Sequence, residues 1–177
     1  MRALVASLVV ALAGCASGTS EMSDWERDHA LRQPAAEEEP ALPPYPDGAN
    51  LIGVDLPGAG DFRFFVDGAT LVAGRDGIIR YVLVARSPDG AQNVSFEGLR
   101  CASADQRVYA LGRADRSWVP AQGEWRRLPR PWHAELYRRY FCPQKQPIRS
   151  ADEGRRALEQ GGHPFARSLG SDDLYSR

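Results

Sequence analysis

Apolar and polar residues alternate along much of the chain from residue 51 onward, a pattern typical of β-strands that bury one face. The longest such run is Ile78–Arg86, whose β-branched and aromatic residues predict a central strand. Asp-Gly pairs interrupt the pattern, and residues 87–90 (Ser-Pro-Asp-Gly) have the proline and glycine positions of a type I turn. Short turns between consecutive strands indicate an antiparallel meander of about five to six strands. The other predicted strands are residues 62–66, 70–72, 93–101, 108–112 and 118–119.

Two helices are predicted after these strands. Pro131 suits the first turn of a helix, and Trp132, Leu136 and Tyr140 follow at a spacing of four, which places them on one helical face. A second helix is predicted over residues 150–162 by a capping box at its start and a Gly-Gly pair at its end. The expected fold is therefore α+β: an antiparallel sheet with the C-terminal helices packed on one face.

An apolar run occupies residues 3–13 near the amino terminus. Its last two residues and the next two form the motif Leu12-Ala13-Gly14-Cys15. It has the length of a signal-peptide core and is shorter than the about 20 apolar residues of a transmembrane helix. The motif resembles the lipobox of bacterial lipoproteins, in which the cysteine carries a thioether-linked diacylglycerol and becomes the first residue. The resemblance implies a signal peptide over residues 1–14 and a lipid anchor at Cys15. The alternative is an ordinary secretory signal cut nearby, in which Cys15 has no role.

Ala16 and Ser17 follow the cysteine, without an adjacent aspartate. By resemblance to known sorting signals, this favours the outer membrane over the inner one. The expected location is thus the cell envelope, with the domain lipid-anchored and facing the periplasm.

The chain has three cysteines, and an odd number in an exported protein requires an explanation. If Cys15 carries lipid, Cys101 and Cys142 remain as a pair in an oxidising compartment, where disulfides persist. We expect these two residues to form a disulfide bond. The alternative is that they are two separate buried thiols.

Charge is distributed unevenly along the chain. Residues 15–50 contain eight acidic and two basic side chains, whereas residues 51–177 contain 15 acidic and 19 basic ones. The first segment is also rich in proline, so we expect an acidic tether, interrupted by a short helix at residues 23–33. A globular domain is predicted over residues 51–162, and residues 163–177, which lack periodicity, are expected to form a flexible tail.

Several spaced motifs resemble the cryptic neisserial protein-like family over residues 42–160. They are LPPYP at 42–46, VAGRDGIIRY at 72–81, NVSFEGLRC at 93–101, YA at 109–110 and HxxLYxxYFC at 133–142. Members of that family are exported proteins of Gram-negative bacteria with no established activity. The resemblance therefore implies a compartment and a domain, and it supplies no chemistry.

The sequence offers one candidate catalytic pair. Glu97 and His133 are an acid and a base that the fold could bring together, with Glu135 nearby, as in a small envelope hydrolase. The alternative is a structural histidine, hydrogen-bonded beside Trp132 or the Glu97-Gly98 turn. No histidine pair has metal-ligand spacing, and no motif for a cofactor is present, so neither a metal nor a cofactor is predicted. Glu97 and Arg100 are also expected near the disulfide, paired with Arg138 or Glu135.

The candidate binding residues are arginines interleaved with aromatic residues, a composition suited to anions and rings. They are Arg126, Arg127, Arg130, Arg138 and Arg139, together with Trp132. The alternative is a solvated basic face. An exported protein does not meet nucleic acid, so the expected partners are the membrane, through the lipid at Cys15, and an anionic envelope component or a periplasmic protein. The leading hypothesis is a non-catalytic, lipid-anchored envelope protein that binds or scaffolds.

Overall fold

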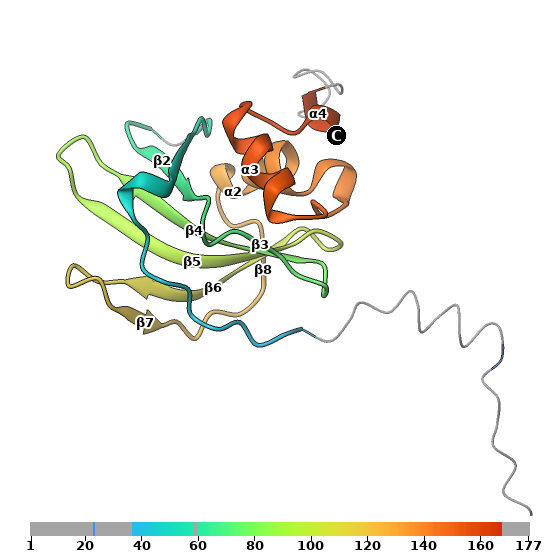
Figure 1. Ribbon diagram of the computed structural model, residues 1–177, viewed down its shortest axis with the longest axis horizontal. Helices are drawn as coiled ribbons and strands as arrows, with labels where there is room; N and C mark the ends of the chain where they lie inside the picture. Colours follow the sequence, from blue (N-terminus) through green and yellow to red (C-terminus); the bar gives the residue numbers. More distant parts are fainter. Residues whose placement is uncertain (1–22, 24–36, 59, 168–177) are drawn as a thin grey trace, which may run out of the picture. The chain divides into compact units, whose positions relative to one another are not determined.

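The computed structural model describes residue 23, residues 37–58 and residues 60–167 (Figure 1). The chain divides into two units between Gln33 and Pro34, and every described residue except Ser23 belongs to the second unit. Cys15, the predicted signal peptide and the predicted helix at 23–33, apart from Ser23, lie outside the described residues. No helix within the described ranges has the length and apolar character that crossing a bilayer requires.

The second unit is built on one antiparallel sheet of eight strands, which confirms the α+β class. The strands are β1 (Leu51–Val54), β2 (Arg63–Asp67), β3 (Val72–Ala73), β4 (Ile78–Arg86), β5 (Gln92–Arg100), β6 (Asp105–Gly112), β7 (Trp118–Pro120) and β8 (Arg126–Arg127). Their order is β1-β2-β4-β5-β6-β7, with β3 also paired to β4 and β8 also paired to β6. The strand number exceeds the prediction, because β1 and β8 are short and lack a clear alternating pattern.

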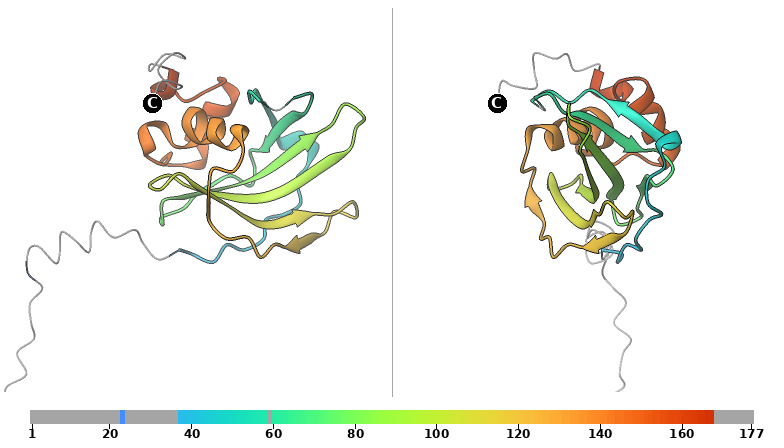
Figure 2. Two further views of the ribbon diagram at one scale, coloured as in Figure 1. Left: turned by 180° about the vertical axis from the view of Figure 1, so that it is seen from behind. Right: turned by 90° about the vertical axis from the view of Figure 1, so that its left-hand side faces the viewer.

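The two long central strands bury side chains on both faces of the sheet. On the face that we call the front, Tyr81 and Leu83 join a core with the helices. On the back face, Val82 and Val84 join a second core with aromatic residues. Figure 2 shows the sheet curved, with the helical segments (orange and red) gathered at one side. Because both faces are covered, the first seven residues of β4 are all buried.

A helical segment begins at Pro131, as predicted, and covers part of the front face. It consists of α2 (Pro131–Glu135) and a π-helical stretch, η2 (Leu136–Phe141). The wider turn ends with the Cys142 amide donating to the Tyr137 carbonyl, five residues back, at 2.7 Å. It brings Tyr137 and Phe141 into the core beside Leu136 and Tyr140. The predicted face of Trp132, Leu136 and Tyr140 is therefore present, and the π-helical stretch broadens it.

The predicted disulfide is present between Cys101, just after β5, and Cys142, at the end of η2. Their Cα atoms are 5.4 Å apart and both residues are buried. The bond closes a loop with a sequence separation of 41 residues, which on the chain-entropy model stabilises the fold by about 4 kcal/mol. It fixes the end of the helical segment to the edge of the front face.

The C-terminal part contains η3 (Pro143–Lys145), α3 (Ala151–Glu159) and α4 (Pro164–Arg167). Ser150 caps α3 by accepting from the Glu153 amide at 3.2 Å, as the capping box predicted. Gly161 follows with a φ of +69°, which a glycine adopts without strain. His163 is buried and its Nε2 lies 3.0 Å from Glu153 Oε1, so the predicted flexible tail does not begin at residue 163. Residues 168–177 lie outside the described residues.

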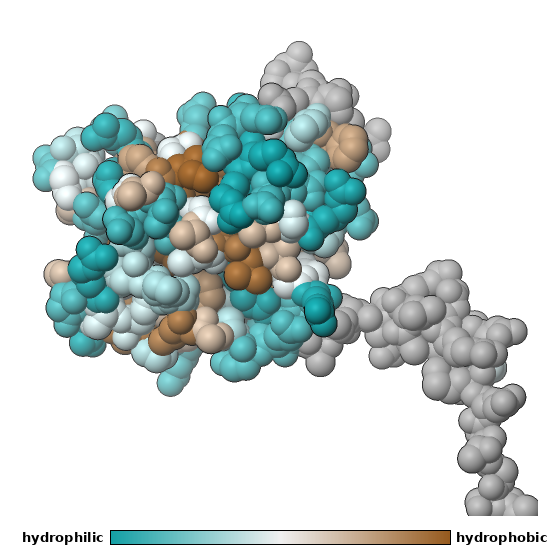
Figure 3. Space-filling view, viewed as in Figure 1, coloured by the Kyte–Doolittle hydropathy of each residue, from teal (hydrophilic) through white to brown (hydrophobic). Residues whose placement is uncertain are grey.

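The predicted tether boundary also needs correction. Residues 37–47, which we call the strap, lie along the back face instead of standing clear of the domain, and they lead through η1 (Gly48–Asn50) into β1. Figure 1 shows this segment in blue and cyan beside β6 and β7. Trp118 Nε1 donates to the Pro43 carbonyl at 2.9 Å, and Tyr45 Oη donates to the Arg113 carbonyl at 2.9 Å. In the view of Figure 3 the surface is mostly hydrophilic, with apolar residues in small separate patches.

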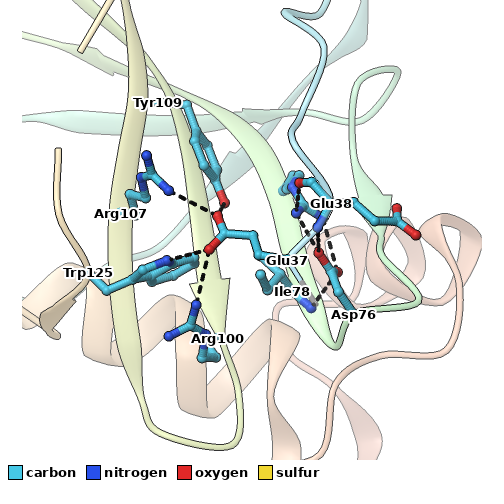
Figure 4. A network of polar contacts seen from close by, with 9 residues as sticks. Glu37, Glu38, Asp76, Ile78, Arg100, Arg107, Tyr109 and Trp125 are labelled. Carbon is cyan, nitrogen blue, oxygen red and sulfur yellow. Dashed lines mark hydrogen bonds and ion pairs between the residues drawn. The ribbon is translucent and has the colours of Figure 1, made fainter. Parts of the chain in front are cut away.

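One carboxylate fixes the start of the strap (Figure 4). Arg107 Nη1 and Tyr109 Oη both donate to Glu37 Oε1 at 3.1 Å. Trp125 Nε1 donates to Glu37 Oε2 at 2.8 Å, and Arg100 Nη2 donates to the same oxygen at 3.2 Å. The Arg100 guanidinium also lies 4.1 Å from the centroid of the Trp125 ring. Four donors from three separate segments thus surround one side chain, and we call this group the Glu37 clamp.

The next residue is held by its backbone. Asp76 Oδ2 accepts from the Glu38 amide at 3.0 Å, and Arg80 Nη2 donates to the Glu38 carbonyl at 2.8 Å. Asp76 and Arg80 are themselves joined by a buried ion pair of 2.6 Å. The Glu38 carboxylate points away from this network in Figure 4. The start of the strap is therefore held by the side chain of Glu37 and by the backbone N–H and C=O of Glu38.

We predict that Glu37→Gln weakens strap docking and lowers the free energy of unfolding by about 1–2 kcal/mol at pH 7, because two partly exposed arginines lose their counter-charge. Burial raises the pKa of the Glu37 carboxyl, but the bonds from Trp125 and Tyr109 and the two arginine charges outweigh it, so the pKa is lowered from 4.5. The contribution is therefore complete above about pH 5.5 and is lost as the pH falls through the lowered value. Urea unfolding of the wild type and of Glu37→Gln at several pH values measures this contribution to the free energy of unfolding.

The matched control for this variant is Glu39→Gln, which removes the same charge from an exposed position in the strap. It should unfold like the wild type, and its strap amides should exchange hydrogen at the wild-type rate. Equal losses from Glu37→Gln and Glu39→Gln would mean that the clamp does not hold the strap.

Candidate functional site

A cavity of about 620 Å³ opens on the front face where the helical segment leaves the sheet uncovered. We call it the front cavity. Its walls are mostly apolar, and two of its aromatic rings, Phe64 and Trp132, have centroids 5.5 Å apart. The wall residues are Phe62, Phe64, Leu83, Ala85, Val108 and Trp132. Strands β2, β4 and β6 supply most of them, because their front-facing side chains continue past the end of α2.

The floor of the front cavity holds a buried carboxylate. Glu97 Oε2 accepts from Tyr81 Oη at 2.9 Å and from Gln106 Nε2 at 3.1 Å, and it lies 3.1 Å from His133 Nε2. The other oxygen, Oε1, accepts from Ser95 Oγ at 2.6 Å. Four side chains from β4, β5, β6 and α2 therefore meet at one residue, and we call them the Glu97 cluster.

The cluster keeps Glu97 ionised. Burial by itself raises the pKa of this carboxyl, but the hydrogen bond and charge of His133 and the bonds from Ser95 and Tyr81 outweigh it, so the pKa is lowered from 4.5. The pKa of the Tyr81 hydroxyl is raised well above 10, by burial first and by the neighbouring Glu97 charge second. Tyr81 consequently remains a donor, and Glu97 remains an acceptor, over the physiological range.

The predicted meeting of Glu97 and His133 is confirmed at 3.1 Å, and both side chains are buried. The second ring nitrogen of His133, Nδ1, is enclosed and has no hydrogen-bond partner among the described residues. A general base has to reach a substrate proton within hydrogen-bond distance. An enclosed Nδ1 does not offer that reach, so the pair fixes the floor of the cavity and presents no exposed base.

The predicted arginines are not on one surface. Arg126 and Arg130 line the mouth of the front cavity with Trp132, and the Arg130 guanidinium lies 5.8 Å from the centroid of the Trp132 ring. Arg127, next on β8, donates to the Ser103 carbonyl at 3.2 Å. Arg139 donates to the Gly161 carbonyl at 2.8 Å and pairs with Glu135 at 3.3 Å, whereas Arg138 is exposed on η2.

The predicted pairing of Glu97 or Arg100 with Arg138 or Glu135 is wrong. Residues 97 and 100 are separated by an odd number of positions in β5, so they face opposite sides of the sheet. Glu97 faces the front cavity, and Arg100 faces the back, where it binds Glu37. Strand alternation alone would have shown that these two side chains cannot meet the same helix.

Sequence reasoning also missed three members of the Glu97 cluster, Tyr81, Ser95 and Gln106. Ser95 shares the front face of β5 with Glu97, at a spacing of two, which was a usable signal. Gln106 is set opposite Leu99 by the pairing of β5 and β6, and only the register between the strands reveals its position.

We predict that Glu97→Gln lowers the free energy of unfolding by about 2–4 kcal/mol at pH 7, because an amide cannot accept from all four donors. Since the folded pKa of Glu97 is lowered from 4.5, its contribution is present above that value and is lost as the pH falls through the folded pKa. The difference between variant and wild type should therefore shrink between pH 5 and pH 3. Urea unfolding across that range measures the difference.

The control variant is Glu124→Gln, which changes an exposed carboxylate at the same cavity. It should alter the free energy of unfolding by less than about 0.5 kcal/mol. A Glu97→Gln protein as stable as wild type at pH 7 would show that the cluster does not stabilise the fold.

A search of curated proteins and a search of solved structures each gave no match. The comparison with family models agrees with the resemblance seen in the sequence. The family model described as the CNP1-like family matches residues 31–159, which include the strap, the sheet and all of α3. The match covers well over half of the chain, so the protein belongs to the CNP1-like family.

Proposed function

We propose that the protein is a lipid-anchored component of the cell envelope that binds an apolar ligand in its front cavity without transforming it. The observation that carries the binding part is the front cavity itself, an apolar-walled space of about 620 Å³ over a polar floor. Small-molecule sites are typically concave, of about 300–1,000 Å³, and mostly apolar with a few placed polar groups. The front cavity fits each part of that description.

The envelope part of the proposal rests on the sequence. The lipobox-like motif that ends at Cys15 would attach the domain to the periplasmic face of the outer membrane, with the acidic segment before the strap as a spacer. The disulfide between Cys101 and Cys142 supports an oxidising compartment. An anionic envelope component or a periplasmic protein remains the proposed partner, alongside the membrane.

A small envelope hydrolase remains the second candidate, because the 3.1 Å contact between Glu97 and His133 is the geometry that it requires. Two features favour binding instead. The Glu97 oxygens already accept from four donors, and His133 Nδ1 is enclosed. A general base has to reach the substrate proton that it accepts, and neither group has a free atom exposed for that purpose.

We predict that the full-length protein fractionates with membranes and that Cys15→Ser releases it into the soluble periplasmic fraction. Mass spectrometry of the mature amino terminus should find a diacylated cysteine at position 15 in the wild type. Ala16→Ser is the control and should leave the protein in the membrane fraction. An unmodified Cys15, or a mature terminus further along the chain, would disprove the anchor and leave the cavity untouched.

We predict that the front cavity binds the neutral probe N-phenyl-1-naphthylamine at one site per chain, with a rise in fluorescence as the probe leaves water. Ala85→Trp places a large ring against the wall and should abolish the signal, and Val108→Phe should weaken it. The control is Val72→Trp, which adds the same ring on β3, beside the strap and outside the front cavity. Unchanged binding by folded Ala85→Trp and Val108→Phe proteins would exclude the cavity as the site.

A further inference from the structure

We infer that the ligand of the front cavity is an anionic amphiphile, whose acid group binds Arg126 and Arg130 at the mouth and whose apolar part contacts the Phe64–Trp132 wall. This inference rests on the proposed function, because it assigns the chemistry of a ligand in the same cavity. It adds a charge, an orientation and the two residues that select for them.

The first step of the argument is that the two mouth arginines have no acidic partner among the described residues. Other arginines of the domain are paired: Arg80 with Asp76, Arg100 and Arg107 with Glu37, and Arg139 with Glu135. Arg126 and Arg130 are both exposed and both line the front cavity. They therefore present guanidinium donors to whatever occupies its mouth.

The second step is that Arg130 is placed for recognition. Its guanidinium lies 5.8 Å from the centroid of the Trp132 ring, at the edge of the cavity wall. Arg126 belongs to β8, where Gln106 of β6 is its register partner, so its backbone is fixed by the sheet. Arginine forms paired hydrogen bonds with planar carboxylates and with phosphates, and it does so best when its position is held in advance.

The third step is that the floor sets the orientation. Glu97 is ionised and buried at the bottom of the cavity, and its oxygens already accept from four donors. An acid group pushed to the floor would lie beside this carboxylate, and the one unpartnered polar atom of the Glu97 cluster, His133 Nδ1, is enclosed. The acid group is thus favoured at the mouth and disfavoured at the floor, while the apolar walls take the remainder of the ligand. Glu124, the one exposed acid among the lining residues, leaves the mouth with a net charge of +1.

Two probes that differ by one charged group test this directly in the full-length, solubilised protein. 1-Anilinonaphthalene-8-sulfonate has the skeleton of N-phenyl-1-naphthylamine with a sulfonate added. We expect the sulfonate probe to bind about tenfold more tightly than the neutral probe, as two charge-assisted contacts would produce. The double variant Arg126→Gln/Arg130→Gln should remove this preference and change the affinity of the neutral probe less than twofold.

The control is Arg113→Gln, an exposed arginine that does not line the front cavity. It should keep the preference for the sulfonate. Displacement by laurate and by dodecyl phosphate, with dodecanol as the uncharged reference, then distinguishes a free fatty acid from a phosphate-bearing lipid as the source of the acid group. Either acid should displace the probe better than dodecanol, and only from a protein with both arginines.

The remaining outcomes distinguish a failure of the anionic-ligand inference from a failure of the proposed function. If the neutral probe binds and the sulfonate has no advantage, or if the double variant keeps the advantage, the anionic ligand is wrong and cavity binding stands. If neither probe binds, or if the filling variants Ala85→Trp and Val108→Phe do not block them, the proposed function itself fails.

Discussion

The disulfide between Cys101 and Cys142 determines how much of the front face is covered. It joins the end of β5 to the end of η2, so the helical segment has to run back over one half of the sheet from that point. The apolar face of η2 then fills the space above Tyr81 and Leu99. In the part of the chain that the structure describes, no helix lies above the other half of the same face. The front cavity is the part of a two-sided core that this covalent constraint leaves open.

The Glu97 cluster shows why the open half keeps its shape. A buried carboxylate is costly unless hydrogen bonds replace its lost water. Here the donors come from three adjacent strands and from α2, so the same bonds that offset burial also tie the helix to the sheet. Removing the charge would loosen the joint between β5 and α2, where Trp132 and Arg130 lie. The polar floor thus supports the apolar wall and the mouth.

Local signals in the sequence were reliable where local physics decides the structure. Ile78–Arg86 was predicted with its observed bounds because a buried central strand concentrates β-branched residues. Ser150 was predicted correctly as the residue that caps α3, because capping depends on residues three apart. Glu37 was assigned to the acidic tether, since its partners lie 63 to 88 residues further along the chain. The π-helical turn was missed for a related reason: the register of η2 is chosen by tertiary packing. No spacing rule contains that information.

The strap and the front cavity lie on opposite faces of the sheet, yet one short segment, residues 125–126, contacts the strap and also lines the cavity. Trp125 faces the back and donates to Glu37, whereas the next residue, Arg126, lines the mouth of the cavity. Alternation along an extended chain requires this division, because neighbouring side chains point to opposite sides. The segment has few other attachments, as β8 pairs with β6 over only two residues. The carboxylate that docks the strap therefore also steadies the backbone that carries a mouth arginine, which couples the position of the strap on the back face to the front cavity.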